Sequence, residues 1–192
     1  MSIDLPQTPP PPQPRSSASS FLLDVIRFAF IALIIVIPFR IFIAQPFIVN
    51  GQSMAPTFDT GEYLIVDQLS YQFSDPNRGD VIVFRSPRNH SVYFIKRIIG
   101  LPGETIEIQR GRVIIHNNTY PDGIRLDEPY VEHIDNGSFQ ATLKNNEYFV
   151  MGDNRQASSD SRSWGALEKS LIQGRPILRL FPLTHLDLLP GT

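Results

Sequence analysis

Cysteine is absent from this chain of 192 residues, and lysine is rare, with three residues against fourteen arginines. The absence of cysteine excludes disulfide bonds, thiol catalysis and zinc sites with cysteine ligands. Four histidines are present, but none lies in a spacing typical of a metal site, and no phosphate-binding glycine loop occurs. The sequence therefore predicts a protein that needs no metal, nucleotide or other cofactor.

A concentration of positive charge is also missing. The formal net charge is −2 at pH 7, and acidic residues outnumber basic ones after Arg40 without any basic stripe. Proteins that bind nucleic acid usually carry such a stripe or patch. The charge pattern therefore argues against nucleic acid as a partner.

The N-terminal residues lack the apolar side chains that folding requires. Residues 1–20 contain six of the 17 prolines and the serine-rich stretch 16–20. Such a composition cannot bury enough apolar surface to offset the entropy of ordering the chain. We expect residues 1–20 to form a disordered tail.

Residues 21–44 are almost wholly apolar, although Asp24, Arg27 and Arg40 interrupt them. The longest charge-free stretch, 28–39, is shorter than the roughly 20 residues that cross a bilayer. Asp24 and Arg27 can pair on a helix, however, and Arg40 can extend its charge to the interface. No small-residue cleavage site follows, as a cleaved signal peptide would need. We therefore expect one transmembrane anchor at 21–44, in preference to a cleaved signal peptide or a soluble helix.

The rest of the chain is expected to be mainly β. Turns containing glycine or proline separate short runs rich in β-branched and aromatic residues, and 109–112 is typical of a tight hairpin. Residues 117–146 are expected to form an excursion or a long hairpin. We expect a single β domain over residues 45–192, preceded by the anchor. The predicted strands are 62–66, 80–84, 92–99, 105–109, 112–116 and 147–151.

Lys96 lies in the middle of the apolar run 92–99. Strand alternation places Val92, Phe94, Lys96 and Ile98 on one face, so the ammonium group points toward apolar surface. Burial lowers the pKa of a lysine, and a neutral amine near pH 7 to 8 is a general base. The alternative is that Lys96 lies on an edge strand and reaches solvent, while Arg97 reaches solvent from the opposite face.

Ser53 is the best candidate for the group that such a base would activate. It lies in an expected exposed turn, between Gly51 and Pro56, at the end of the apolar segment. A serine in such a turn more often hydrogen-bonds its own backbone. A second polar segment, 152–165, directly follows a predicted strand and could equally be a solvated loop. Single residues therefore leave the function open.

Four blocks of sequence, taken in order, resemble bacterial type I signal peptidases, which are membrane-bound serine/lysine proteases. The resemblance runs from about Phe21 to the C-terminus, and the order of the blocks makes it specific. The blocks are Ser53-Met54-Ala55-Pro56-Thr57, Arg78-Gly79-Asp80-Val81-Ile82-Val83-Phe84, Lys96-Arg97-Ile98-Ile99-Gly100-Leu101-Pro102-Gly103-Glu104, and Gly152-Asp153-Asn154-Arg155 continuing through Ser158, Asp160-Ser161-Arg162 and Trp164-Gly165.

The resemblance implies Ser53 as the nucleophile, Lys96 as the general base and Ser158 as a hydroxyl that hydrogen-bonds the lysine. It implies that charged residues brace the site by ion pairing, and that large apolar side chains form the wall against which small substrate side chains bind. The bracing residues are Arg97, Asp153, Asp160 and Arg162. The substrate wall is Phe47, Val49, Met54, Phe58, Val83, Phe94 and Ile95.

The chain departs from the family pattern in two places. Gly51 stands where some members have a hydroxyl residue that contributes to the oxyanion hole, although others also have glycine. The oxyanion hole would then depend on the Ser53 backbone N–H and a second donor that the sequence does not identify. Gln156-Ala157 replaces the more usual Asp-Asn, which questions a polar role at those two positions but not at Ser158.

By this resemblance the substrates are the signal peptides of exported preproteins, cut after small residues at positions −1 and −3. The partners would be those peptides and a lipid bilayer, with the β domain outside the cytoplasm. Arg15 and Arg27 favour a cytoplasmic N-terminus, whereas Arg40 opposes it. The cell membrane is the expected location, and an internal membrane such as the thylakoid stays open.

Two alternatives remain at this point. A self-cleaving serine/lysine repressor would share the catalytic fold, but it should carry a basic helix-turn-helix domain where this chain has a proline-rich tail and an apolar segment. A membrane-anchored β module that binds without cutting would make Ser53 and Lys96 incidental.

Overall fold

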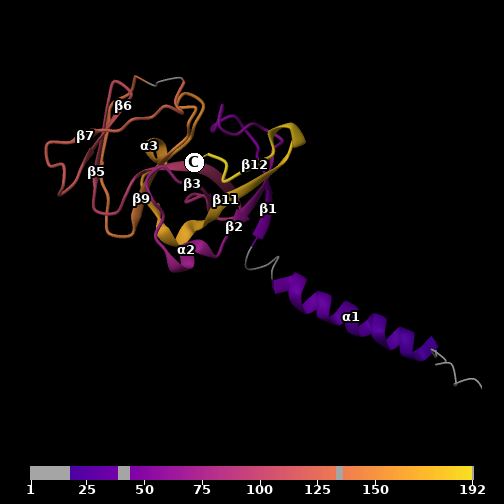
Figure 1. Ribbon diagram of the computed structural model, residues 1–192. Helices are drawn as coiled ribbons and strands as arrows, with labels where there is room; N and C mark the ends of the chain where they lie inside the picture. The colour runs from indigo at the N-terminus through magenta and orange to yellow at the C-terminus, as the bar shows by residue number, and fades with distance from the viewer. Residues whose placement is uncertain (1–17, 39–43, 133–135, 192) are drawn as a thin grey trace, which may run out of the picture. The chain divides into compact units, whose positions relative to one another are not determined.

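The computed structural model describes residues 18–38, 44–132 and 136–191. These residues belong to two compact units, Met1–Phe39 and Arg40–Thr192. The first contains one helix, and the second is the mainly β body that carries the candidate site (Figure 1). The expectation of a mainly β protein is therefore confirmed.

The first unit contains α1 (Ala18–Pro38), in which apolar side chains such as Phe21 and Phe28 are exposed. Among residues 18–38, 44–132 and 136–191, no helix is long and apolar enough to cross a membrane. The transmembrane helix expected at 21–44 is therefore not confirmed, and its residues 39–43 lie outside the described part. Residues 1–17 of the expected tail also lie outside it, while 18–20 belong to α1.

The larger sheet of the β body has the strand order β1-β2-β11-β3-β4-β9-β10, and β12 pairs with β11. All of these neighbours are antiparallel. The strands are β1 (Ala44–Ile48), β2 (Tyr63–Asp67), β3 (Val81–Arg85), β4 (Tyr93–Gly100), β9 (Glu147–Met151), β10 (Leu167–Glu168), β11 (Ile172–Phe181) and β12 (Asp187–Leu188).

The smaller sheet has the order β7-β6-β5-β8 and is also antiparallel. In Figure 1 it lies on the side of the β body away from β1 and β12. Arg110 and Gly111, the two residues between β5 and β6, have φ values of 49° and 75°, as a type I′ hairpin requires. The tight hairpin expected at 109–112 is thus confirmed. The strands are β5 (Thr105–Gln109), β6 (Arg112–His116), β7 (Ile124–Arg125) and β8 (Phe139–Thr142).

Short helical turns complete the fold. Asp160 caps the N-terminus of α3, because its side chain accepts from the Arg162 backbone N–H. The turns are α2 (Ser70–Phe73), α3 (Ser161–Trp164), η2 (Lys169–Leu171) and η3 (Leu183–His185).

Three clusters of buried apolar side chains hold the β body together. One joins the smaller sheet to β4 and β9, and includes Ile106 and Phe149. The second lies against the larger sheet around Phe84. The third packs Met54 and Phe58 beneath the turn that carries Ser53. That turn therefore rests on a packed apolar base.

All six predicted strands are present within one residue of their expected ends, but the sequence analysis did not predict the other described strands, among them β11, the longest. Gly174 and Pro176 interrupt its pattern, and its pairing shifts register at both of its neighbours, β2 and β3. Glycine and proline weaken a strand signal, and irregular pairing breaks the alternation on which prediction depends. Tertiary pairing on both sides makes these residues a strand nonetheless.

Gly174→Ala should destabilise the β body, because a Cβ at this position would lie 2.0 Å from the Asp67 carbonyl oxygen. Backbone atoms cannot yield as a flexible side chain can, so we expect a loss of about 2 kcal/mol or more in the free energy of unfolding. Leu180→Ala, at an exposed position of the same strand, is the control and should change it by about 0.5 kcal/mol or less. Urea unfolding of both variants measures this, and equal stability would contradict the close approach.

Candidate active site

Ser53 and Lys96 are in direct contact, although 43 residues separate them in the chain. The Lys96 Nζ donates to Ser53 Oγ at 2.7 Å and to the Ile95 carbonyl at 2.8 Å. Strand β4 positions Lys96, and Ser53 lies in the turn that follows β1. Two backbone hydrogen bonds close the base of that turn, from Val49 N–H to the Glu62 carbonyl and from Gly61 N–H to the Val49 carbonyl. The expected pair is therefore brought together.

The Lys96 side chain has lost most of its hydration. The residue is 3% exposed, and burial lowers its pKa from 10.5 to about 8, while the negative charges of Asp160 and Asp153 act in the opposite direction. No carboxylate forms a direct ion pair with it among the described residues. Desolvation outweighs the two carboxylates, so a substantial fraction of Lys96 is neutral near pH 8.

Ser158 lies beside the pair but does not make the expected hydrogen bond to Lys96. Its Oγ is buried and has no hydrogen-bond partner among the described residues. A Cβ on Gly152 would lie 2.3 Å from the Ser53 carbonyl oxygen and 2.4 Å from Ser158 Oγ. Glycine at 152 thus lets the nucleophile turn and Ser158 approach the same point.

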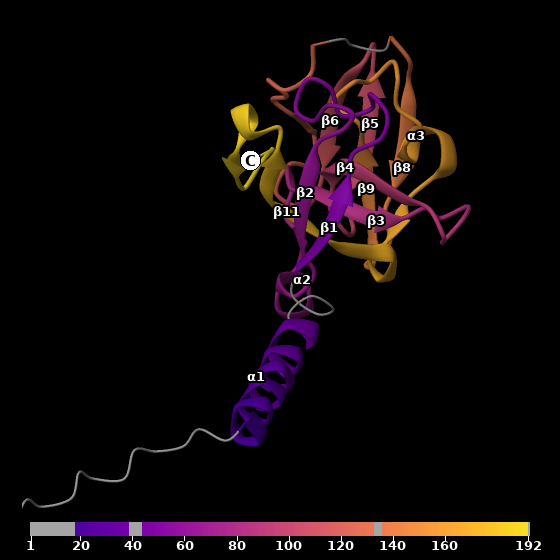
Figure 2. The same cartoon turned by 90° about the vertical axis from the view of Figure 1, so that its right-hand side faces the viewer.

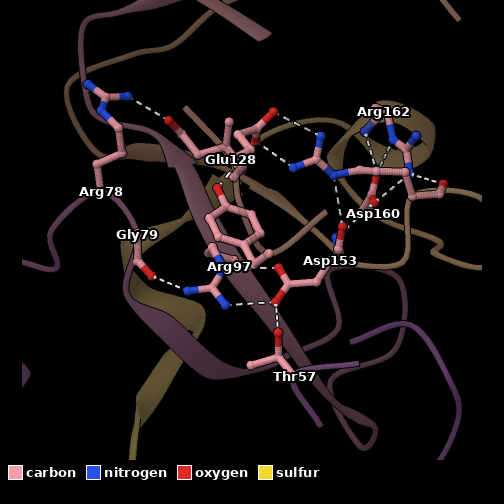
Figure 3. A network of polar contacts seen from close by, with 12 residues as sticks. Thr57, Arg78, Gly79, Arg97, Glu128, Asp153, Asp160 and Arg162 are labelled. Atoms are coloured by element: carbon pink, nitrogen blue, oxygen red, sulfur yellow. Dashed lines mark hydrogen bonds and ion pairs between the residues drawn. The ribbon is translucent and has the colours of Figure 1, made fainter. Parts of the chain in front are cut away.

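Arg97 is buried and forms an ion pair with Asp153, so the expectation that it reaches solvent is wrong. Its Nε and Nη2 donate to the Asp153 carboxylate at 2.9 and 2.7 Å, and their side chains are 5% and 0% exposed. Thr57, from the nucleophile turn, donates to the same carboxylate at 2.6 Å (Figure 3). Arg97 also donates to the Gly79 and Gly191 carbonyls. The pair therefore joins β4, the nucleophile turn and the C-terminal end.

The other expected ion pair, Asp160 with Arg162, is also present. Arg162 Nε and Nη2 each donate to the Asp160 carboxylate at 2.8 Å, and Nη2 reaches the Arg155 carbonyl at 2.7 Å. Asp160 accepts a further hydrogen bond from the Gly152 N–H at 3.1 Å. These contacts fix the segment that carries Gly152 and Ser158.

Residues 128–130, which the sequence analysis left without a role, complete this network. Glu128 and Arg155 form a two-armed ion pair at 2.5 and 3.2 Å, and Arg155 Nε donates to the Gly152 carbonyl. The Arg97 guanidinium lies over the Tyr130 ring, 4.0 Å from the ring centre. A lone acidic residue and a tyrosine in a polar loop give no sequence signal of these contacts.

A second missed pair braces the nucleophile turn from β11. Arg179 donates to Glu62 at 2.8 Å and to the Thr57 carbonyl at 2.9 Å, and its guanidinium lies 4.9 Å from the centre of the Phe58 ring. Glu62 is 2% exposed. The turn is therefore held by side chains from two directions.

A cleft of about 110 Å³ opens beside Ser53 and Lys96. Of the expected wall, Phe47, Val49, Val83, Phe94 and Ile95 line it. Met54 and Phe58 do not, because they are 1% and 0% exposed and form the packed base beneath the turn. The sequence analysis missed four lining residues, which lie next to or across from predicted ones. These are Ile48, Asn50, Leu64 and Tyr93.

Among the residues that the structure describes, no three His, Cys, Asp or Glu side chains are close enough together to hold a metal ion. The charged groups Arg97, Asp153, Asp160 and Arg162 are instead paired with one another. The chemistry that the arrangement offers is proton transfer between a hydroxyl and a poised amine.

Asp153→Asn should destabilise the protein strongly, because it leaves the buried Arg97 without its counter-charge. Breaking a buried pair in this way typically costs about 3–5 kcal/mol. Asp75→Asn removes the exposed partner of Lys169 and should cost about 1 kcal/mol or less. Urea unfolding measures both, and comparable small losses would show that the Arg97 pair does not stabilise the fold.

Comparison with known proteins relates the chain to one family. Residues 22–181 match the family described as signal peptidase, peptidase S26. The signal peptidase I of Leptolyngbya laminosa is 35% identical over 191 residues, covering 94% of this chain and 91% of that protein. The probable signal peptidase I-1 of Synechocystis sp. is 36% identical over 180 residues, covering 90% of this chain and 89% of that protein.

Among solved structures, a crystal structure of a signal peptidase I from Enterococcus faecalis V583 is 34% identical and matches with a TM-score of 0.45. The match covers 53% of this chain and 97% of that chain. The family match covers most of the sequence, and both relatives exceed 30% identity over nearly their whole length. The chain belongs to the signal peptidase family, peptidase S26.

Proposed function

We propose that this protein is a membrane-bound endopeptidase that removes N-terminal signal peptides from exported preproteins with a serine/lysine pair. The observation that carries the proposal is the 2.7 Å contact between Ser53 Oγ and the buried Lys96 Nζ at the edge of an apolar cleft. The names of its relatives support the substrate class, because they are signal peptidases.

In this mechanism, neutral Lys96 removes the proton from the Ser53 hydroxyl as Oγ attacks the carbonyl carbon of the scissile bond. The tetrahedral intermediate collapses when protonated Lys96 donates that proton to the leaving amine. An ester between Ser53 and the signal peptide remains. Lys96, neutral again, then removes a proton from the water that hydrolyses this ester and returns it to Ser53.

The oxyanion that forms in both steps needs hydrogen-bond donors. The Ser53 backbone N–H is the donor that the sequence indicates. The Gly51 N–H does not serve, because it donates to Thr60 Oγ1 at 3.1 Å. The second donor would be another group of the turn around Ser53, or a group that reaches the oxyanion only when the substrate is bound.

The strand edges next to the cleft support binding of an extended peptide. β1 pairs only with β2 among the described strands, and β9 pairs with β4 only from Arg97 onward. Residues 93–96 therefore present an edge free of described strands on the side away from β3. A peptide strand can add to such an edge, and alternation then directs its −1 and −3 side chains to the same wall.

The size of the cleft supports small side chains at these positions. The cleft of about 110 Å³ is smaller than the cavity of about 150 Å³ that is known to accept a benzene ring, which favours small side chains over phenylalanine. We further propose that the β body lies outside the cytoplasm at a membrane to which the chain is attached, because exported preproteins emerge there.

Lys96→Arg should abolish cleavage of a preprotein in detergent, because guanidinium stays protonated and cannot accept the Ser53 proton. Ser53→Ala should be equally inactive. Lys144→Arg, at a lysine 80% exposed outside the site, is the control and should cleave like the wild type. Cleavage by Lys96→Arg or Ser53→Ala at a near wild-type rate would contradict the serine/lysine mechanism, whereas a wild-type protein that cuts no preprotein would leave a β module that binds without this chemistry.

The rate of cleavage should rise with pH and level off above about 8, because the free base of Lys96 is the active form. At pH 7 about a tenth of the lysine is neutral, if its pKa is about 8. Initial rates between pH 6 and pH 10 measure this, up to the onset of alkaline unfolding. A rate that still increases tenfold per pH unit above 9 would mean that burial does not lower the pKa.

Ser158→Ala should lower the turnover number more than it changes KM, because the Ser158 hydroxyl lies near the Ser53 carbonyl across Gly152 and does not line the cleft. Steady-state kinetics separate the two constants. A variant with wild-type turnover would remove Ser158 from the reaction.

Preproteins with Ala→Phe at −1 or −3 should be cut poorly, whereas Ala→Phe at −2 should matter less, because that side chain turns away from the wall. The ratio kcat/KM for the three substrates tests this. Equal losses at all three positions would reject an extended substrate.

A further inference from the structure

Three arginines of the smaller sheet, which contains β5 and β6 (Figure 2), line a second cleft that shares no lining residue with the cleft beside Ser53. Arg110, Arg112 and Arg125 line a cleft of about 750 Å³, together with Gln109, Ile114 and Asn136. Arg110 lies in the β5–β6 turn, Arg112 begins β6 and Arg125 ends β7. No acidic residue is among these lining residues, although the chain as a whole carries a net charge of −2.

The register of the sheet places these side chains on one face. Arg125 pairs with Ile114, and Arg112 pairs with Gln109. Val113 and Ile115, which flank Ile114 on β6, point into the core. Residues directly opposite in a sheet share a face, so Arg112 and Arg125 lie on the outer face around Ile114, and Arg110 lines the same cleft from the β5–β6 turn. The sequence shows no basic stripe because the positive charge is assembled from separate strands.

These arginines differ from the others of the β body. Among residues 44–132 and 136–191, each other arginine has an ion pair, a hydrogen bond or an aromatic contact. The side chains of Arg110, Arg112 and Arg125 have none in the described structure. The nearby carboxylate of Glu107 is already engaged by His116 and Gln109. Like charges within about 10 Å repel one another in solution at moderate salt, and an anion in the cleft would relieve this repulsion.

We propose that this cleft binds a phosphate-bearing anion. The guanidinium fork donates two parallel hydrogen bonds to phosphate oxygens, and the amides of Gln109 and Asn136 add neutral donors. Its volume is within the range of ligand sites and exceeds what one small ion fills. The ligand chemistry is a polyphosphate or a phosphate headgroup of an anionic lipid. This site is independent of the proposed peptidase activity.

The first test is isothermal titration of the full-length protein in detergent with tripolyphosphate. Replacing all three arginines by glutamine (Arg110→Gln, Arg112→Gln, Arg125→Gln) should weaken binding at least about tenfold, which corresponds to about 1.4 kcal/mol. The control variant, Arg88→Gln with Lys144→Gln and Lys169→Gln, removes the same number of charges outside the cleft and should bind like the wild type. Equal weakening in both variants would overturn the proposal, because it would show a net-charge effect only.

The second test separates the two sources of phosphate. Vesicles of phosphatidylcholine, with and without phosphatidylglycerol, are sedimented with each protein, and α1 is present in all of them. A preference for phosphatidylglycerol that the cleft variant loses supports a lipid headgroup, whereas tripolyphosphate binding without that preference supports a free phosphate. Absence of both, or equally tight binding of a polyglutamate peptide, would overturn the phosphate site.

Folding is checked by thermal unfolding. The cleft variant should melt no lower than the wild type, because the change removes repulsion and breaks no described contact. Exchanging the three arginines for lysine keeps the charge but loses the guanidinium fork. The affinity of this lysine variant for tripolyphosphate should fall between those of the wild type and the glutamine variant. A lysine variant that binds as tightly as the wild type, or a glutamine variant with a clearly lower melting temperature, would contradict the proposed role of the guanidinium groups.

Discussion

Burial of the Lys96 amine is the constraint on which the proposed site depends. Moving the pKa from 10.5 to about 8 corresponds to a cost on the order of 3 kcal/mol at neutral pH. This cost is fully present below about pH 8, and it disappears as pH rises toward 10.5, because the unfolded chain then binds more protons than the folded one. The rest of the fold must supply the stability that this lysine removes.

The ion pairs around Lys96 supply part of that stability. The carboxylates of Asp160 and Asp153 raise the pKa of Lys96 less than burial lowers it, and each is paired with an arginine instead of with the lysine. The same arginines reach backbone carbonyls of the C-terminal end and of the segment before α3. The ion pairs thus hold the nucleophile turn, β4 and the 152–162 segment together while leaving the amine without a counter-charge.

Features that depend on local pattern were predictable from the sequence. Alternation along β4 indicated the inward direction of Lys96, and the glycine at 111 indicated the β5–β6 hairpin. The four sequence blocks then singled out Ser53, which the structure places 2.7 Å from Lys96. Burial of Arg97 could not be seen locally, because its partner Asp153 lies 56 residues away. The same reason explains why Glu128 and Tyr130 were missed.

Assignments that depend on which side of a packed layer a residue faces were less predictable. Met54 and Phe58 are as apolar as Phe47 and Phe94, yet they lie beneath the nucleophile turn and not in the cleft. Strand β11 was missed because its glycine and its irregular pairing hide the alternation. In both cases packing between residues distant in the chain decides the structure, and the local sequence does not predict it.

The protonation state of Lys96 is the most direct test of this account. With only three lysines, isotope labelling of lysine side chains gives three signals to follow by NMR during a pH titration, and Lys96→Arg identifies one of them. Ion pairs with Glu147 and Asp75 raise the pKa values of Lys144 and Lys169, so these two serve as internal references. The account predicts a midpoint of about 8 for Lys96. If Lys96 instead titrates in the same range as the two reference lysines, with a midpoint at or above 10.5, the account is contradicted.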